Sequence, residues 1–358
     1  MANRDLIVIG GSAGSIQPLK EILRLLPADL PAAVIVVIHI PAKSPGMEAV
    51  ATSAGGPLPV VMAEDGMRIQ SGHVYLAPAG FHLLVADEQL RLGNGPRENH
   101  ARPAIDPLFR SAAASRGSRT IGVVLSGSLD DGASGLETIK RCGGIALVQS
   151  PDDARVSEMP VAALDATPVD LSAAPPVLAA AMERFAREDA PPSTPVSKET
   201  RLEIEIAAGE AVDNILVEKI AHATTLSCPD CGGVLSSIAK GHPLRFRCQI
   251  GHAHTARSVF RRQHAQVHQA LQVALRIVQE RADLIDRMER DATDAGRPGM
   301  AQLYADRSAE YRSHADTIRQ AIFELPEDHP TTDTVNLLPN REVLGAEDSF
   351  EISESSEN

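Results

Sequence analysis

The chain of 358 residues lacks three features that would each indicate a class of protein. No stretch approaches 18 uninterrupted apolar residues, so no segment has the character of a membrane-spanning helix. The N-terminus has no basic segment followed by an apolar core and a cleavage site, so we expect a cytosolic protein. Basic residues are in deficit, with 34 Lys and Arg against 47 Asp and Glu and a formal charge of −13. This balance argues against a general nucleic-acid binder and against insertion into anionic membranes.

Cysteine is scarce as well, and its placement is informative. Three of the four cysteines cluster at positions 228, 231 and 248. Such a cluster suits a metal site in a reducing compartment better than a set of disulfides. Hydrophobic residues, in contrast, make up 43% of the chain, which is typical of a globular protein. The length of the chain allows two domains.

A short apolar run near the N-terminus, Leu6–Ile9, is followed by two glycines and Ser12. The run predicts a buried parallel strand, and the periodic segment 16–26 predicts a helix after a sharp glycine turn. Ser12 would then lie at a helix N-terminus, where free N–H groups and the dipole favour a developing anion. This position suits the nucleophile of an acyl transfer. On this stretch alone, a ligand-binding turn and a serine that caps the helix stay open as alternatives.

The same residues fail the common phosphate-binding patterns. Ser12 and Ser15 occupy the second and third glycine positions of G-x-G-x-x-G, and no G-x-x-x-x-G-K-[ST] occurs. Residues 10–14 do match G-x-S-x-G, the nucleophile elbow of α/β-hydrolases. A pattern of five residues does not identify a fold, so the rest of the chain has to decide.

Residues 6 to about 185 alternate apolar strands with helical segments, which predicts a doubly wound, mainly parallel α/β sheet. We expect further strands at 33–39, 120–125 and 145–149, helices at 107–114 and from 136, and a short antiparallel excursion formed by 72–77 and 82–86.

Three polar residues, Ser12, His39 and Asp131, each lie just past a predicted strand. Parallel sheets place their sites at the carboxyl ends of strands, so we expect these side chains to meet. His39 would take the proton from Ser12 and return one to the leaving group, and Asp131 would accept from the other ring nitrogen. The N–H of Ala13 or its neighbours is a candidate oxyanion donor, and no cofactor is needed for catalysis. Asp130 is the rival acid, because adjacent loop residues cannot both face one imidazole.

The order Ser, His, Asp differs from the order Ser, acid, His of the α/β-hydrolases and therefore indicates another scaffold. Seven motifs, in chain order, identify one: Ile9–Gly14, Val37–His39 with Pro41, Ala63–Gly66, Val74–Pro78, Arg102–Phe109, Asp131–Gly135 and Met159–Pro160. Together they resemble the catalytic domain of the CheB chemotaxis methylesterases, over residues 5 to about 180.

The resemblance implies a serine esterase, a protein-glutamate methylesterase, that hydrolyses γ-glutamyl methyl esters and often deamidates glutamines. Its partners would be the cytoplasmic helices of methylated chemoreceptors or another methylated signalling protein. The family roles of nucleophile, base and acid correspond to Ser12, His39 and Asp131, in agreement with their positions at strand ends.

Several residues depart from the family pattern. The usual threonine after the serine is Ala13, one glycine of a Gly-Gly pair is Ser15, and a common methionine before the acid is Ser128. These changes leave open a catalytically drifted signalling scaffold.

We also expect no receiver domain, because the first strand begins by residue 6. We expect Arg102 and Asp106 to form a structural ion pair, with a role in orienting substrate as the alternative.

The cysteine cluster predicts a second centre. Cys228 and Cys231 offer two thiolates to one ion, and Cys248 and His252 form a second pair across a short hairpin. Four ligands at this spacing predict a structural tetrahedral zinc in a segment too small to fold without metal. A redox C-x-x-C or free cysteines in a small core are the alternatives, and His254 competes with His252. The segment also resembles a zinc-ribbon-like appendage that some CheB-like proteins without a receiver carry.

Composition shifts divide the chain. The proline-rich stretch 187–195 predicts a linker, a helical run follows from about 200 to 223, and apolar residues recur at helical spacing from 257. We expect the last helices to form a hairpin that packs on itself, with a partner-binding device or a dimer as the alternative. The expected division is 1–186 methylesterase domain, 187–199 linker, 200–258 helix plus zinc-ribbon-like module, 259–325 α-helical hairpin and 326–358 acidic disordered tail.

Overall fold

The apolar runs of the first half form one parallel sheet. The computed structural model describes residues 3–39, 55–210, 221–238 and 243–325. Seven strands pair in the order β3-β4-β2-β1-β7-β8-β9. They are β1 Leu6–Gly11, β2 Ala33–Ile38, β3 Val60–Met62, β4 Val74–Leu76, β7 Thr120–Val124, β8 Ile145–Gln149 and β9 Leu171–Ala173. The central strands are buried along their whole length, as expected where both faces of a parallel sheet are covered.

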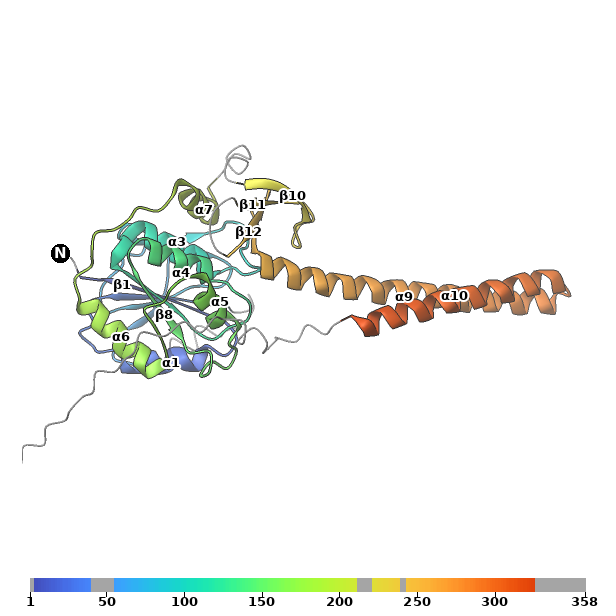
Figure 1. Cartoon of the computed structure of the whole chain (residues 1–358), viewed down its shortest axis with the longest axis horizontal. Coiled ribbons are helices and arrows are strands. Elements are labelled where there is room, and N and C mark those ends of the chain that lie inside the picture. The colour runs from blue at the N-terminus through green and yellow to red at the C-terminus, as the bar shows by residue number, and fades with distance from the viewer. Residues whose placement is uncertain (1–2, 40–54, 211–220, 239–242, 326–358) are drawn as a thin grey trace, which may run out of the picture. The chain divides into compact units, whose positions relative to one another are not determined.

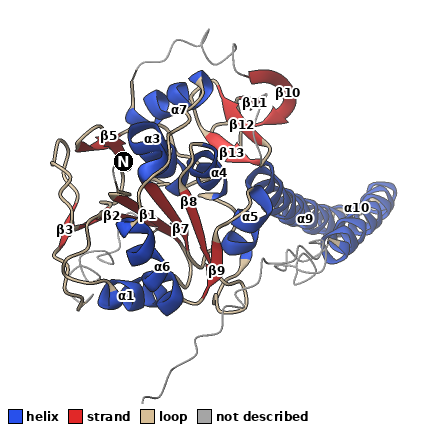
Figure 2. Cartoon of the chain, turned by 60° about the vertical axis from the view of Figure 1, so that its left-hand side comes forward, coloured by secondary structure: helices blue, strands red, loops and turns tan. Residues whose placement is uncertain are grey.

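Helices cover both faces of the sheet (Figure 2). Along β1, Ile7 and Ile9 pack with one helix pair, whereas Leu6 and Val8 pack with three helices on the opposite face. The first pair is α1 Ile16–Leu25 and α6 Pro175–Arg187, and the other three are α3 Ile105–Arg116, α4 Ala133–Arg141 and α5 Glu158–Ala166. The predicted doubly wound α/β architecture is confirmed.

The prediction that 72–77 pairs with 82–86 in an antiparallel ladder is wrong. β4 lies inside the parallel sheet between β2 and β3, because Val74–Leu76 is buried on both faces. β5 (His82–Ala86) pairs instead with β6 (Gln89–Gly93), across a tight turn in which Asp87 has φ +50°. The segment 82–86 therefore forms a hairpin with the residues that follow it rather than with 72–77.

The predicted helix over 200–223 is shorter than expected. It is α7 (Lys198–Ala208), which begins at a cap where Ser197 accepts from the Thr200 N–H and ends at Gly209 with φ +85°. Residues 221–223 lie in the strand β10 (Ala221–Ser227), so the helix prediction is wrong there. Residues 211–220 lie outside the described residues.

The cysteine-bearing segment is a small antiparallel sheet followed by two long helices (Figure 1). Its strand order is β10-β11-β12-β13, with β11 Val234–Ile238, β12 Arg245–Cys248 and β13 Ala253–Thr255. α9 (Ala256–Asp294) and α10 (Pro298–Glu324) pack on each other, and the Arg281 guanidinium lies 5.1 Å from the Tyr311 ring centre. No helix of the described residues is long and apolar enough to cross a bilayer. The predicted tail, 326–358, lies outside the described residues.

Candidate active site

The three predicted active-site residues lie at the carboxyl edge of the sheet. Ser12 is the first residue after β1, and His39 is the first after the neighbouring strand β2. The His39 N–H donates to the Gly11 carbonyl at 3.0 Å, which holds the histidine beside the residue that precedes Ser12. β7 flanks β1 on its other side and leads into the loop that carries Asp131.

Asp131 and His39 are in direct contact. The Nε2 atom of His39 lies 2.7 Å from Oδ2 of Asp131, and the aspartate side chain is only 1% exposed. This leaves Nδ1 as the ring nitrogen that can receive a proton. Within the described residues no hydrogen bond joins His39 to the Ser12 hydroxyl, and such bonds are often long in a ligand-free site. The structure thus brings the predicted base and the predicted acid together and places Ser12 on the adjacent strand end.

The Asp131 carboxylate lies at the N-terminus of α3. It accepts hydrogen bonds from the first two helical N–H groups, Ile105 at 2.7 Å and Asp106 at 3.2 Å, and from the Asn99 side chain at 3.1 Å. Burial alone would raise the pKa of Asp131, but the hydrogen bonds from His39, Ile105 and Asn99 hold it below its ordinary value. Asp131 is therefore ionised at neutral pH and fixes the tautomer of His39. Sequence reasoning missed both Asn99 and the role of the helix terminus.

The rival acid Asp130 has a different partner. Its Oδ1 accepts from the Thr255 hydroxyl at 2.6 Å, at the start of α9. Burial raises the pKa of Asp130 to about 6. The two adjacent carboxylates thus bind different partners, and Asp131 is the one that reaches the imidazole.

The ion pair expected between Arg102 and Asp106 is not formed, and that prediction is wrong. Arg102 donates to the carbonyls of Asn94 and Gly95, whereas Oδ1 of Asp106 accepts from the N–H groups of Gly132 and Gly135. Burial and the neighbouring negative charge on Asp131 raise the pKa of Asp106 to about 8. Asp106 therefore takes up a proton more readily than an exposed aspartate, and it supports the loop that bears Asp131.

We expect Asp106→Asn to flatten the pH dependence of the unfolding free energy. The Asp106 pKa rises from 3.8 to about 8 on folding, so its contribution to stability is complete below pH 3.8 and is lost as the pH rises through 8. Asparagine does not titrate and keeps an oxygen for the Gly132 and Gly135 donors. Urea unfolding of both proteins at about pH 5 and about pH 8 measures the difference. Identical pH dependences would mean that Asp106 is already ionised at neutral pH.

The turn after β1 surrounds Ser12 with backbone groups. α1 begins only at Ile16, so Ser12 lies about one turn before the helix rather than at its first residue. Its N–H donates to the Ser126 carbonyl at 2.9 Å. Within the described residues the N–H groups of Ala13 and Gly14 donate to no protein acceptor, which leaves them as candidate oxyanion donors.

Gly127 keeps space open beside Ser12. A Cβ built on Gly127 would lie 2.9 Å from the Ser12 Cβ and 2.7 Å from Cε of Met159. Any side chain at this position would therefore press on the serine, which explains why glycine stands in the loop that follows β7.

The four predicted metal ligands converge. Ligand atoms of Cys228, Cys231, Cys248 and His252 all lie within 4.8 Å of one another, so the cluster could bind a metal ion such as zinc. The first pair lies on a turn closed by the Gly232 N–H donating to the Cys228 carbonyl, with Gly232 at φ +73°. The second lies on a turn in which the Cys248 N–H donates to the His252 carbonyl. Two tight turns thus present two ligands each.

His254 belongs to a neighbouring group. Its Nε2 lies 3.6 Å from the Cys228 Sγ, but its ring groups with His100 and Asp230 rather than with the four ligands. His100 also contacts Asp230, at 2.9 Å. Of the two competing histidines, His252 is therefore the one placed as the fourth ligand.

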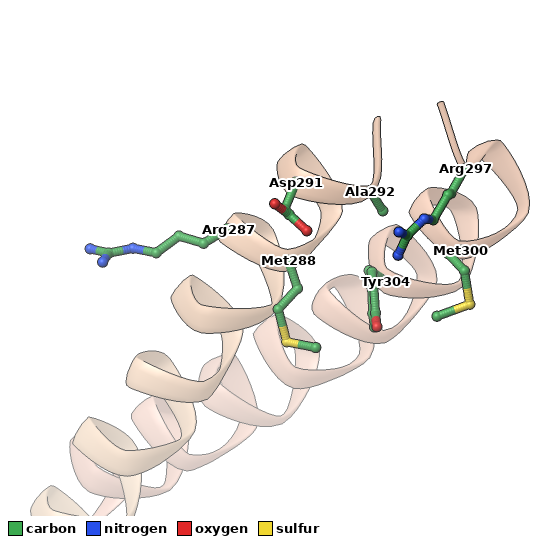
Figure 3. A pocket seen from close by; sticks show the side chains of 7 residues that line it. All are labelled: Arg287, Met288, Asp291, Ala292, Arg297, Met300 and Tyr304. Carbon is green, nitrogen blue, oxygen red and sulfur yellow. The ribbon is translucent and has the colours of Figure 1, made fainter. Parts of the chain in front are cut away.

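A pocket at the tip of the helical hairpin is not the predicted site. It lies between α9 and α10 and is lined by Arg287, Met288, Asp291, Ala292, Arg297, Met300 and Tyr304 (Figure 3). None of the predicted catalytic or metal-binding residues lines it.

The fold and the site together define a class of protein: a parallel α/β protein with a serine, a histidine and an aspartate at one edge of the sheet. Residues 7–182 match the family model of the CheB methylesterases. A protein of Leptospira interrogans is 41% identical over 169 residues, which is 47% of this chain and 88% of that protein. The chain belongs to the CheB methylesterase family.

Other relatives match a similar share of the chain. The protein-glutamate methylesterase/protein-glutamine glutaminase 2 of Methanosarcina acetivorans is 36% identical over 167 residues, which is 44% of this chain and 47% of that protein. The solved catalytic domain of the Thermotoga maritima CheB methylesterase is 29% identical, with a TM-score of 0.48, and the match covers 51% of this chain and 99% of that one. The cysteine cluster and the long helices lie outside the family match.

Proposed function

We propose that this chain is a serine hydrolase that removes methyl esters from glutamate γ-carboxyls of proteins, with methylated chemoreceptor helices as the substrate class. The observation that carries the proposal is the 2.7 Å contact between His39 and Asp131 on the strand end next to Ser12. Membership of the CheB methylesterase family supports it. The names of the relatives also support glutamine deamidation as a second reaction of the same site.

The chemistry follows from the positions of these groups. The Ser12 hydroxyl attacks the ester carbonyl while Nδ1 of His39 takes its proton, and the N–H groups of Ala13 and Gly14 stabilise the oxyanion. His39 then gives the proton to the methoxy oxygen, and methanol leaves an acyl-serine. A water molecule, deprotonated by His39, hydrolyses that ester and restores Ser12. Asp131 stabilises the imidazolium in both halves of the reaction.

The direct test measures methanol released from a methylated chemoreceptor by the purified full-length chain. A serine-directed phosphonate, followed by mass spectrometry of the labelled peptide, identifies the nucleophile. We expect methanol release and a single adduct on the peptide that contains Ser12. Absence of both would reject the hydrolase and leave the alternative, a signalling scaffold that has drifted from catalysis through the changes at Ala13, Ser15 and Ser128.

We further propose that the cysteine cluster holds a structural zinc. A tetrahedral zinc with Zn–S of about 2.3 Å and Zn–N of about 2.0–2.1 Å requires S–S separations of about 3.8 Å and S–N separations of about 3.5 Å. Cys231 and Cys248 lie 3.7 Å apart, and Nδ1 of His252 lies 3.8 Å from Cys228 and 3.5 Å from Cys248. The metal would tie the two turns of the small sheet together.

We expect one zinc per chain in the purified protein and its loss in Cys248→Ser. Removing one of four ligands weakens the site, and the small sheet then loses the main source of its stability. Elemental analysis and thermal unfolding measure the two effects. Cys142→Ser is the matched control, because Cys142 is a buried free cysteine outside the cluster. Metal-free protein, or equal metal content in both variants, would contradict the proposal.

We place the protein in the cytoplasm, since free cysteines in a thiolate metal site suit a reducing compartment. Dimerisation through α9 and α10 stays a prediction.

A further inference from the structure

The cysteine-bearing sheet docks on a short segment of the methylesterase domain, residues 97–100. β13 forms a parallel bridge with it between Ala253 and Glu98. The Asn99 N–H donates to the Ala253 carbonyl at 2.8 Å, and the Ala253 N–H donates to the Arg97 carbonyl at 3.3 Å. The small sheet is thereby bonded, backbone to backbone, to the residues that precede α3.

Charged groups reinforce this contact from inside. Arg247, which precedes the metal ligand Cys248, is fully buried and lies 3.0 Å from Glu98 and 3.3 Å from Glu203 of α7. Glu98 also pairs with the buried Arg110 of α3. Each of these buried charges has a charged partner, so replacing one of them would leave another buried and unpaired, which is strongly destabilising.

One side chain connects this contact to Asp131. The Asn99 amide donates from Nδ2 to Oδ1 of Asp131 at 3.1 Å, and its own Oδ1 accepts from the Thr255 N–H at 3.0 Å. The Thr255 N–H holds the amide oxygen on the β13 side, and the NH₂ group must then face the carboxylate. If that N–H moved away, the amide would be free to turn its oxygen toward Asp131, where two acceptors would repel.

Thr255 is itself fixed by the elements on either side. It lies three residues after the metal ligand His252 and caps α9, where its hydroxyl oxygen accepts from the Ser258 N–H at 3.1 Å. The same hydroxyl donates to Asp130. The position of the Thr255 N–H therefore depends on the ordered state of the cysteine-bearing sheet.

We propose that Asn99 is a positioning residue through which the cysteine-bearing sheet, held by its metal, keeps Asp131 aligned with His39. The inference rests on the proposed hydrolase function. It makes the esterase responsive to the C-terminal module: an event that disorders the sheet, such as loss of the metal, lowers the rate of the chemical step without touching the substrate site.

Asn99→Gly is the first test, because glycine adopts the observed φ of +48° without strain. We expect kcat to fall roughly tenfold to hundredfold, the range for a hydrogen bond to a charged group, with KM unchanged. Arg97→Ala is the matched control, since the Arg97 side chain is exposed and only its backbone binds β13. The proton shared by His39 and Asp131 gives a low-field NMR signal that should shift in Asn99→Gly and stay in place in Arg97→Ala.

The second test is a double-mutant cycle that combines Asn99→Gly with Cys231→Ser. The Cys231→Ser change removes the exposed ligand of the cluster. We expect Cys231→Ser to lower kcat in the unaltered chain and to have little further effect in Asn99→Gly. Zinc content and thermal unfolding are measured for all four proteins. Additive losses, or an unchanged NMR signal in Asn99→Gly, would overturn the inference while leaving the hydrolase intact. An unaltered chain without esterase activity would overturn both.

Discussion

Ser12→Ala is expected to reduce methanol release from a methylated receptor by ~10⁴- to 10⁶-fold, because the change removes the hydroxyl oxygen that we propose forms the acyl intermediate. The fold should survive the change. Within the described residues the Ser12 hydroxyl makes no hydrogen bond, and the contacts of this residue run through its backbone, to Ser126 and Ser15. Single-turnover methanol assays measure the loss, and thermal unfolding confirms that the sheet is unchanged.

Two further measurements make this expectation specific. Ser172→Ala changes an exposed serine on β9 and should leave both the rate and the phosphonate adduct as they are. Ser12→Ala should lose the adduct completely, while the hydrogen bond between His39 and Asp131 persists. If Ser12→Ala kept a rate within about tenfold of the unaltered chain, the nucleophile would have to be water activated by His39 rather than the serine.

The positions of Ser12, His39 and Asp131 could be predicted because one rule covers all three. Each follows a strand composed almost entirely of Ile, Leu, Val, Ala and Gly, and such strands lie parallel in the centre of an α/β sheet with their carboxyl ends at one edge. The ligand pairs of the cysteine cluster were predictable for a similar reason, since each pair is local in sequence and needs only a tight turn.

Asn99 could not be predicted in the same way. Its partners Asp131 and Thr255 lie 32 and 156 residues away, and no periodicity connects them. A polar amide in a loop is ordinarily solvated, and its burial here depends on β13 covering the segment 97–100. The contact of Asp130 with Thr255 has the same origin. Interactions between a domain and its appendage follow from how the two surfaces fit, which a linear pattern does not encode.

The pairing of β5 with β6 had a usable signal. In Gln89–Gly93, Leu90 and Leu92 alternate with polar residues, which is the period of a strand with one buried face. Asp87 and Glu88 form a turn short enough to join it to β5. Val74–Leu76, in contrast, has no charged or amide side chain and is buried at all three positions, which indicates the interior of a parallel sheet rather than a hairpin.

Asp131→Asn is expected to lower kcat/KM by ~10³- to 10⁴-fold, the size of effect seen when the acid of a serine–histidine relay becomes an amide. The aspartate has no neutral substitute at this place, because both of its oxygens accept: Oδ2 from His39 and the Ile105 N–H, Oδ1 from Asn99 and the Asp106 N–H. An amide must turn its NH₂ group toward one of these pairs of donors. If the NH₂ group faces His39 and the Ile105 N–H, the imidazole loses its acceptor or changes tautomer. If it faces Asn99 and the Asp106 N–H, it meets two donors instead, and in either orientation the misplaced donor costs about 1–3 kcal/mol of stability.

Asp130→Asn is the control variant, because it tests whether the neighbouring aspartate of the same loop contributes to the rate. Asparagine at position 130 keeps an oxygen for the Thr255 hydroxyl and does not face His39, so we expect a loss of less than about tenfold. Measuring kcat/KM and the thermal midpoint for both variants places each effect on catalysis or on folding. A larger loss in Asp130→Asn than in Asp131→Asn would transfer the role of the acid to Asp130, and would require the loop to turn its other carboxylate toward the imidazole when substrate binds.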